Sequence, residues 1–303
     1  MTRMKWIALS FSALVLCSMG VADTKAPQTS TPTKLTAAEI VEKNVAARGG
    51  LQAWRTVQTM SMTGQMEAGG NDRPASRTPG STVQQLSSPR PADQVKLPFV
   101  LDLKRGRKQR IELQFKGETA LQVYDGANGW KLRPYLNRLE VEPFTAEELR
   151  ATTIQSELDG PLVDYASKGT KIELAGTEQI EGRDTYKLKL IFTNGQTQHV
   201  WIDAATFLES RFEGTPRRLD GAYHPVYVYY RDFRPVYGLM VPFLLETRVE
   251  LEKPLRGSKE ISEKIVVDEV VVNPKLEESL FSRPNVGSAT SQSKAPVGGH
   301  SQP

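Results

Sequence analysis

Within residues 107–117, "RKQRIELQFKG", polar and apolar positions alternate strictly from residue 110 to residue 116. Charged or amide side chains occupy the even positions, and Ile111, Leu113 and Phe115 occupy odd ones. A period of two is typical of a β-strand with one face in water and one face buried. The pattern therefore predicts a strand whose apolar side faces either a closed core or a bound ligand.

The same alternation recurs along most of the chain after residue 57 and predicts about eleven antiparallel strands. The turns between them are short, and no alternation of strands with helices appears, which favours one large curved sheet over two packed sheets. We therefore expect a mainly β fold built on one large curved antiparallel sheet. The side chains expected on its concave face are Leu97, Phe99, Leu101, Leu103, Ile111, Leu113, Phe115, Tyr186, Leu188, Leu190 and Phe192.

Two helical regions are predicted, at residues 36–48 and 145–158. Each opens with a capping box, "TAAE" from Thr36 and "TAEE" from Thr145, in which a hydroxyl and a carboxylate satisfy free amides of the first turn. Two amphipathic helices are too few to cover both faces of a large sheet, so we expect them to form a lid over the concave face. The expected lid residues are Ile40, Val41, Val45, Leu149, Ile154 and Leu158.

The first 22 residues have the pattern of a secretory signal peptide. Arg3 and Lys5 precede an apolar run at residues 6–17, and small residues follow at 20–22. The run is too short to span a bilayer, which disfavours an uncleaved anchor and predicts cleavage after Ala22. The expected location is therefore the periplasm.

Cys17 is the only cysteine, and its position in the signal region raises the alternative of a lipidated N-terminus. Leu16 precedes it where a lipoprotein signal needs a small residue, so a soluble exported protein is favoured. A chain that loses Cys17 has no disulfide and must fold by burial alone. The expected organisation is a signal peptide at 1–22, a linker at 23–34, a ligand-binding domain at 35–284 that contains a long loop at 67–94, and a disordered tail at 285–303.

Composition and side-chain chemistry exclude several classes of function. The 303 residues are 39% hydrophobic and 24% charged, with a formal charge of +4 and no dense basic run, so nucleic acid is not an expected partner. His199 and His224 lack a local carboxylate partner, and His300 lies in the tail, so the sequence predicts no catalytic residues, no metal and no cofactor. A set of aromatic residues would fill a wide concavity or contact a ligand in it: Trp54, Trp130, Trp201, Tyr227, Tyr229, Phe233 and Phe243.

Several motifs together resemble the LolA-like outer-membrane lipoprotein-sorting proteins. The resemblance runs from about Leu35 to Pro284, and the motifs that carry it are "AAEIVEKNVAARGGLQAWRTVQTMSMTGQM", "VYDGANGWKLRP", "LDGPLVDYASKGTKIELAGTEQIEGRDTYKLKL", "VWIDAATFLESR", "YVYYRDFRPVYGLMVPF" and "VVNPKLEESLFSRP". The resemblance implies a half-open barrel with an apolar inner surface, a helical lid and an arginine that ties the lid shut. Arg107, which has the parity of Ile111, is the candidate for this latch.

The resemblance further implies a monomeric periplasmic carrier that binds acyl chains of lipoproteins or lipids and exchanges them with inner- and outer-membrane transfer proteins. Three alternatives stay open. The first is an envelope regulator or interaction module that senses lipid or protein ligands. The second is a closed core on the inner face, with the fold used as a scaffold. The third is a lipid hydrolase, for which His199 and His224 are the first candidates.

Overall fold

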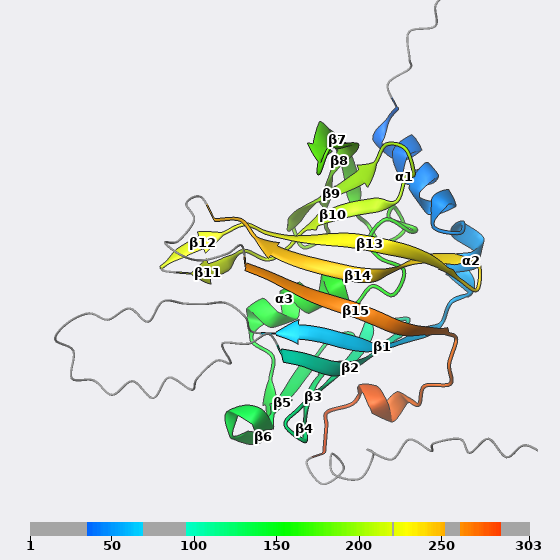
Figure 1. Ribbon diagram of the computed structural model, residues 1–303. Helices are drawn as coiled ribbons and strands as arrows, with labels where there is room; N and C mark the ends of the chain where they lie inside the picture. The colour runs from blue at the N-terminus through cyan, green and yellow to red at the C-terminus, as the bar shows by residue number, and fades with distance from the viewer. Residues whose placement is uncertain (1–34, 69–94, 220, 252–260, 286–303) are drawn as a thin grey trace, which may run out of the picture. The chain divides into compact units, whose positions relative to one another are not determined.

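The computed structural model describes residues 35–68, 95–219, 221–251 and 261–285, all within the unit Leu35–Pro303 (Figure 1). The predicted signal peptide with Cys17, the linker and His300 lie outside the described residues, as do residues 69–94 of the predicted loop and 286–303 of the predicted tail. Among the described residues, no helix has the length and apolar content to cross a membrane.

The first and last strands of the fold lie side by side in one large sheet. β1 (Thr59–Ala68) pairs antiparallel with β15 (Ile261–Val272) on one side and with β2 (Val95–Lys104) on the other. The spatial order among the described strands is β6-β5-β4-β3-β2-β1-β15-β14-β13-β10-β9-β8-β7, and the pairing is antiparallel throughout. The two edge strands, β6 and β7, do not pair with each other, so the large antiparallel sheet is not closed and has the form of a half-open barrel, as the resemblance implies.

The other strands of the main sheet are β3 (Lys108–Phe115), β4 (Glu118–Tyr124), β5 (Gly129–Arg133), β6 (Arg138–Pro143), β7 (Lys171–Ile180), β8 (Arg183–Ile191), β9 (Thr197–Asp203), β10 (Glu209–Glu213), β13 (Val226–Val236) and β14 (Leu239–Val249). A separate two-stranded sheet pairs β11 (Arg217–Leu219) with β12 (Ala222–His224). The main sheet has thirteen described strands where about eleven were expected. The additional two are β5 and β6, which are only five and six residues long and flank the 3-10 helix η1 (Pro134–Leu136).

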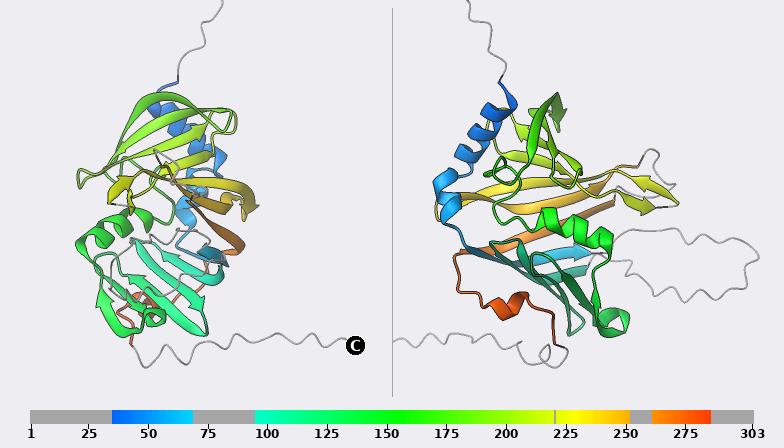
Figure 2. Two further views of the ribbon diagram at one scale, coloured as in Figure 1. Left: turned by 60° about the vertical axis from the view of Figure 1, so that its left-hand side comes forward. Right: turned by 180° about the vertical axis from the view of Figure 1, so that it is seen from behind.

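The helices cover the inner face at two places. α1 (Ala37–Ala47) and α2 (Leu51–Thr56) precede β1, and α3 (Ala146–Gln155) lies over the strands when the molecule is seen from behind (Figure 2). Both predicted capping boxes are confirmed: the amides of Glu39 and Glu148 donate to the hydroxyls of Thr36 and Thr145 at 3.3 and 3.2 Å. α3, which corresponds to the second predicted helix, ends at Gln155 rather than at residue 158. Residues 156–169, called here the cover segment, continue to β7 as a series of turns.

One continuous core lies between the sheet and these covering elements. Ile40, Val41 and Val45 of α1 are buried in it, together with Leu162 and Val163 of the cover segment. Asn44 of α1 donates to the carbonyl of Phe207 at 2.8 Å, so the helix is fixed beside the β9–β10 connection. The core is therefore filled on the β7–β10 side of the inner face.

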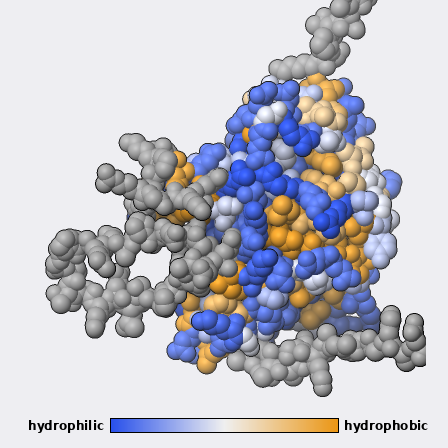
Figure 3. All heavy atoms as spheres, in the orientation of Figure 1, coloured by the Kyte–Doolittle hydropathy of each residue, from blue (hydrophilic) through white to orange (hydrophobic). Residues whose placement is uncertain are grey.

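The outer face of the sheet is largely polar, with groups of apolar side chains among the polar ones (Figure 3). Val266 of β15 pairs with Leu244 of β14 and is 37% exposed there. On the neighbouring strands β2 and β3, the short 3-10 helix η2 (Glu278–Phe281) covers this face: Glu278 bridges Lys104 and Lys108 at 2.6 and 2.5 Å. The inner face is thus the apolar one, as the alternation predicts.

Candidate functional site

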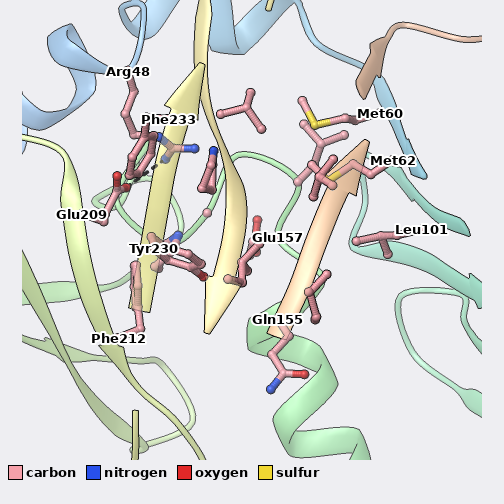
Figure 4. A pocket seen from close by; sticks show the side chains of 18 of the residues that line it. Arg48, Met60, Met62, Leu101, Gln155, Glu157, Glu209, Phe212, Tyr230 and Phe233 are labelled. Carbon is pink, nitrogen blue, oxygen red and sulfur yellow. Dashed lines mark ion pairs between the residues drawn. The ribbon is translucent and has the colours of Figure 1, made fainter. Parts of the chain in front are cut away.

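An apolar pocket with a cavity of about 270 Å³ lies on the inner face of the sheet, beneath the cover segment (Figure 4). Seven neighbouring strands, from β3 to β10 in the spatial order, contribute to it. With neighbouring strands about 4.8 Å apart, the lining follows the sheet for about 29 Å. The residues around it are Arg48, Trp54, Met60, Met62, Met66, Phe99, Leu101, Ile111, Gln155, Glu157, Leu158, Gly160, Pro161, Glu209, Phe212, Tyr230, Phe233, Val241, Pro242, Leu245, Ile265 and Val267.

Strand register explains why the floor of the pocket is apolar. Met62 of β1 pairs with Leu101 of β2, and Leu101 pairs with Ile111 of β3. Paired residues of adjacent strands point to the same face of a sheet, so the alternation within each strand adds up to one apolar surface. Gly64 of β1 lies at a bulge, where a Cβ atom would collide with the carbonyl oxygen of Val266. The bulge bends β1 locally.

The predicted concave residues fall into two groups. Phe99, Leu101 and Ile111 line the pocket, as does the predicted lid residue Leu158. A second group packs in the core instead: Leu103, Leu113, Tyr186, Leu188, Leu190, Phe192, Ile40, Val41 and Val45. The β8 side chains of this group are covered, because Leu188 and Leu190 are fully buried in the same cluster as α1.

The remaining predicted residues lie away from the pocket lining. Leu97 is half-buried on β2, and Phe115 packs edge-on against Tyr135 with ring centres 5.9 Å apart. Leu149 is half-buried on α3, and Ile154 lines a small separate pocket beside Arg107.

Ten of the 22 lining residues come from β1, β13, β14 and β15, and of these ten the sequence singled out only Phe233. The missed apolar residues include Met60, Met62, Tyr230, Leu245 and Ile265. Their alternation is visible in the sequence, but only the pairing of β1 with β15 places them beside β2. That long-range pairing carries no local signal.

A polar pair interrupts the apolar wall at the β10 side of the pocket. The guanidinium of Arg48, which follows α1, lies 3.3 Å from Glu209 Oε1, and the two side chains are 10% and 5% exposed. Arg48 also donates to the carbonyl of Asp159 at 2.9 Å and stacks over the ring of Trp54 at 4.3 Å. Burial, with the Glu209 carboxylate adding to the effect, raises the pKa of the nearby Tyr230 phenol to about 12.

Ion pairs tie the cover segment to the sheet. Arg105, at the start of the β2–β3 connection, contacts Asp159 at 2.8 Å, and Arg107 in the same turn contacts Glu157 at 2.5 Å. Lys168 joins the two acids from within the segment, at 2.5 Å from Asp159 and 3.3 Å from Glu157. These contacts cross from the turn of the sheet to the chain that covers the pocket.

The latch candidate Arg107 therefore touches the cover, but its position differs from the expectation. It lies in the turn before β3 with a φ of 61°, so strand parity with Ile111 does not decide its direction. Arg105, which the sequence did not single out, makes the more buried contact, because Asp159 is only 2% exposed. Arg105 also donates to the carbonyls of Val57 and Trp54 at 2.6 and 2.5 Å.

The two histidines lie outside the pocket. His199 of β9 contacts Glu213 at 2.7 Å, and His224 is on β12 of the small sheet. Within the described ranges, no group of three or more His, Cys, Asp and Glu residues is placed to hold a metal ion.

The predicted aromatic set is also divided between the faces. Trp54 and Phe233 line the pocket and Phe243 lies in the core. Trp201, Tyr227 and Tyr229 form a separate cluster, in which the Arg211 guanidinium lies 3.9 Å from the Trp201 ring centre and 4.2 Å from that of Tyr227. Trp130 is half-buried on β5.

No protein-family model matches the sequence, and no curated protein matches it. Solved structures that resemble the chain include a LolA superfamily protein from Nitrosomonas europaea, with 13% identity and a TM-score of 0.49, covering 82% of this chain and 98% of the other. A domain from Vibrio parahaemolyticus named for outer membrane lipoprotein sorting has 15% identity and a TM-score of 0.48, covering 81% of this chain and 95% of the other. A DUF1329 family protein from Desulfovibrio piger has the same identity and score, covering 82% of this chain and 98% of the other. At this distance the likeness says nothing of ligand or activity.

Proposed function

We propose that this protein is a periplasmic carrier that holds an acyl chain of a lipid or lipoprotein in the pocket beneath the cover segment and delivers it toward the outer membrane. The observation that supports this most is an apolar pocket that extends across seven strands under a cover held by ion pairs. The apolar residues of the wall favour a hydrocarbon ligand. Movement of the cover segment would let that ligand enter without any change in the sheet.

The energetics of an alkyl chain suit this pocket. Each buried methylene contributes about 0.8 kcal/mol, so about ten of them contribute roughly 8 kcal/mol, the equivalent of a micromolar dissociation constant before ordering costs. The cavity of about 270 Å³ is just below the roughly 300–1,000 Å³ of common small-molecule sites. A longer chain would require the cover segment to move outward.

The residues proposed to contact the chain are the three expected ones that line the pocket, Phe99, Leu101 and Ile111, together with the methionines of β1. Methionine side chains are flexible and adapt to ligands of different shape. Arg107 and Arg105 are proposed as the latch, and residues 35–284 as a single ligand-binding domain that is exported by the signal peptide.

Native mass spectrometry of the full chain, purified from the envelope of a bacterium that exports it, tests the first part. We expect bound species with the mass of an acylated molecule, and consistently empty protein would contradict the proposal. Delivery is tested by the transfer of a fluorescent acyl lipid from donor to acceptor vesicles. A protein that binds the lipid but does not speed its transfer would favour the sensing or regulatory alternative.

Crosslinking the cover segment to the β2–β3 turn tests whether lipid transfer requires the cover to open. In a Cys17→Ser background, Arg107→Cys with Glu157→Cys can be joined by a bismaleimide, since the side chains meet across the turn and the cover. The crosslinked protein should lose transfer relative to the same double variant without crosslinker. The matched control joins Arg138→Cys with Glu142→Cys, an exposed pair on β6, and should leave transfer unchanged.

A further inference from the structure

The pair formed by Arg48 and Glu209 places polar groups in the pocket wall, and a purely hydrocarbon ligand would form no hydrogen bonds with them. Arg48 and Glu209 lie next to each other at one side of the pocket, while Met60, Met62 and Leu101 lie at the opposite side (Figure 4). Both charged side chains are nine-tenths or more buried. Because their charges are opposite and 3.3 Å apart, the pair presents no net charge to the cavity.

The pair also has unused hydrogen-bonding capacity. Among the described residues, neither Arg48 Nε nor Glu209 Oε2 has a hydrogen-bond partner, although both atoms are buried. Buried polar atoms without a partner are costly, and native proteins satisfy most of them with protein, water or ligand. An unpaired donor and an unpaired acceptor therefore belong to two neighbouring residues that line the same side of the pocket.

The neighbouring groups hold this arrangement in place. The Asp159 carbonyl and the Trp54 ring fix the Arg48 guanidinium from two directions. Tyr230 lines the same side of the pocket, and its raised pKa of about 12 keeps the phenol protonated, so that it is a further neutral hydrogen-bonding group. Asp159 belongs to the cover segment, so the polar pair is completed only when the cover is in place.

We infer that the pocket selects amphiphiles with a neutral head, namely an alkyl chain that ends in an amide or a hydroxyl, whose head donates to Glu209 Oε2 and accepts from Arg48 Nε. This inference rests on the proposed function, since it names the class of ligand for the same pocket. A free carboxylate or phosphate would approach the Glu209 carboxylate, and an ammonium would approach the Arg48 guanidinium. Either ion would be desolvated beside a like charge without a counter-ion of its own.

Displacement of the neutral fluorescent probe N-phenyl-1-naphthylamine from the full chain tests this preference. The competitors share one twelve-carbon chain and differ in the head: dodecanamide, 1-dodecanol, dodecanoate and dodecylammonium, all at pH 8. The amide and the alcohol should displace the probe at concentrations at least about tenfold lower than the two ions do. Equal potency of all four, or a preference for an ion, would overturn the inference while leaving the proposed function intact. If none of the four binds, the proposed function fails as well.

Variants of the pair give a second, independent readout. Glu209→Gln keeps the shape but leaves the Arg48 charge alone, and should shift the amide-to-carboxylate preference toward the carboxylate by at least about tenfold. The double variant R48Q/E209Q removes both charges and should again prefer the neutral heads. Glu181→Gln, which removes an acid paired with Arg231 outside the pocket, is the matched control and should change nothing.

Circular dichroism verifies that each variant is folded. If the amide-to-carboxylate preference is the same in wild type, Glu209→Gln and the double variant, the polar pair does not determine which head group the pocket prefers.

Discussion

Asp159 is the point where the cover segment is held most firmly, so Asp159→Asn should loosen the cover. Its carboxylate is 2% exposed and contacts Arg105 at 2.8 Å and Lys168 at 2.5 Å. The amide keeps the size of the side chain and removes its charge. The backbone carbonyl of Asp159, which accepts from Arg48, is not altered.

The free energy that Asp159→Asn is expected to cost follows from how exposed the two cationic partners of Asp159 are. Removing one member of a fully buried ion pair costs about 3–5 kcal/mol, and an exposed pair contributes about 0–1 kcal/mol. Arg105 is 32% exposed and Lys168 is 16% exposed, so we expect an intermediate loss of about 2 kcal/mol. If this loss falls on the closed form alone, the open form becomes roughly thirtyfold more populated.

Hydrogen exchange measured by mass spectrometry checks this expectation. Amides of residues 156–169 should exchange roughly thirtyfold faster in the variant, with little change in β13 and β14. Glu277→Gln is the control, because the Lys275–Glu277 pair is highly exposed and should contribute nothing measurable. Unchanged exchange of the cover, or an equal acceleration in every strand, would refute the idea that Asp159 holds a separately opening segment.

Three further expectations follow from the same structure. Leu101→Trp should fill the pocket and weaken alkyl-chain binding at least about tenfold in a displacement assay, with the fold retained. Burial works against ionisation of Glu148, but its bond to Lys131 and its capping contact outweigh this and lower its pKa below 4.5. The stabilisation it gives α3 is therefore complete above pH 4.5 and is lost as the pH falls through the lowered value, so α3 should exchange faster in acid, and Glu148→Gln should remove that dependence. Arg211→Met, beside the Trp201 ring, should lower the free energy of unfolding by about 1–2 kcal/mol in a denaturant titration and leave ligand binding unchanged, because that cluster is separate from the pocket.

The sheet was predictable from the sequence because its signal is local. Alternation on β2, β3 and β8 fixes which side chains share a face, and the two capping boxes fix where α1 and α3 begin. β5 and β6 were missed because they are only five and six residues long and Pro134 lies in the short connection between them.

The pocket was predictable only in part, since a periodic pattern gives the face of a side chain but not what covers it. Leu101 and Leu188 have the same alternation, yet the first lines the pocket and the second is packed in the core with α1. The difference lies in the path of α1 and the cover segment, which depends on contacts far apart in the sequence, such as Arg48 with Glu209. Arg107, the predicted latch residue, contacts the cover segment at Glu157, whereas the more buried contact of Arg105 with Asp159 could be seen only in the coordinates.

The central claim, that an alkyl chain lodges on the inner face beneath the cover, is tested most directly by photo-crosslinking. A twelve-carbon amide with a diazirine near the end of its chain is bound to the full protein, irradiated, and its attachment site is mapped by peptide mass spectrometry. The account predicts labels on Met60, Met62, Leu101 or Ile111. Labels confined to the outer face around Leu244 and Val266, or no saturable label at all, would contradict it.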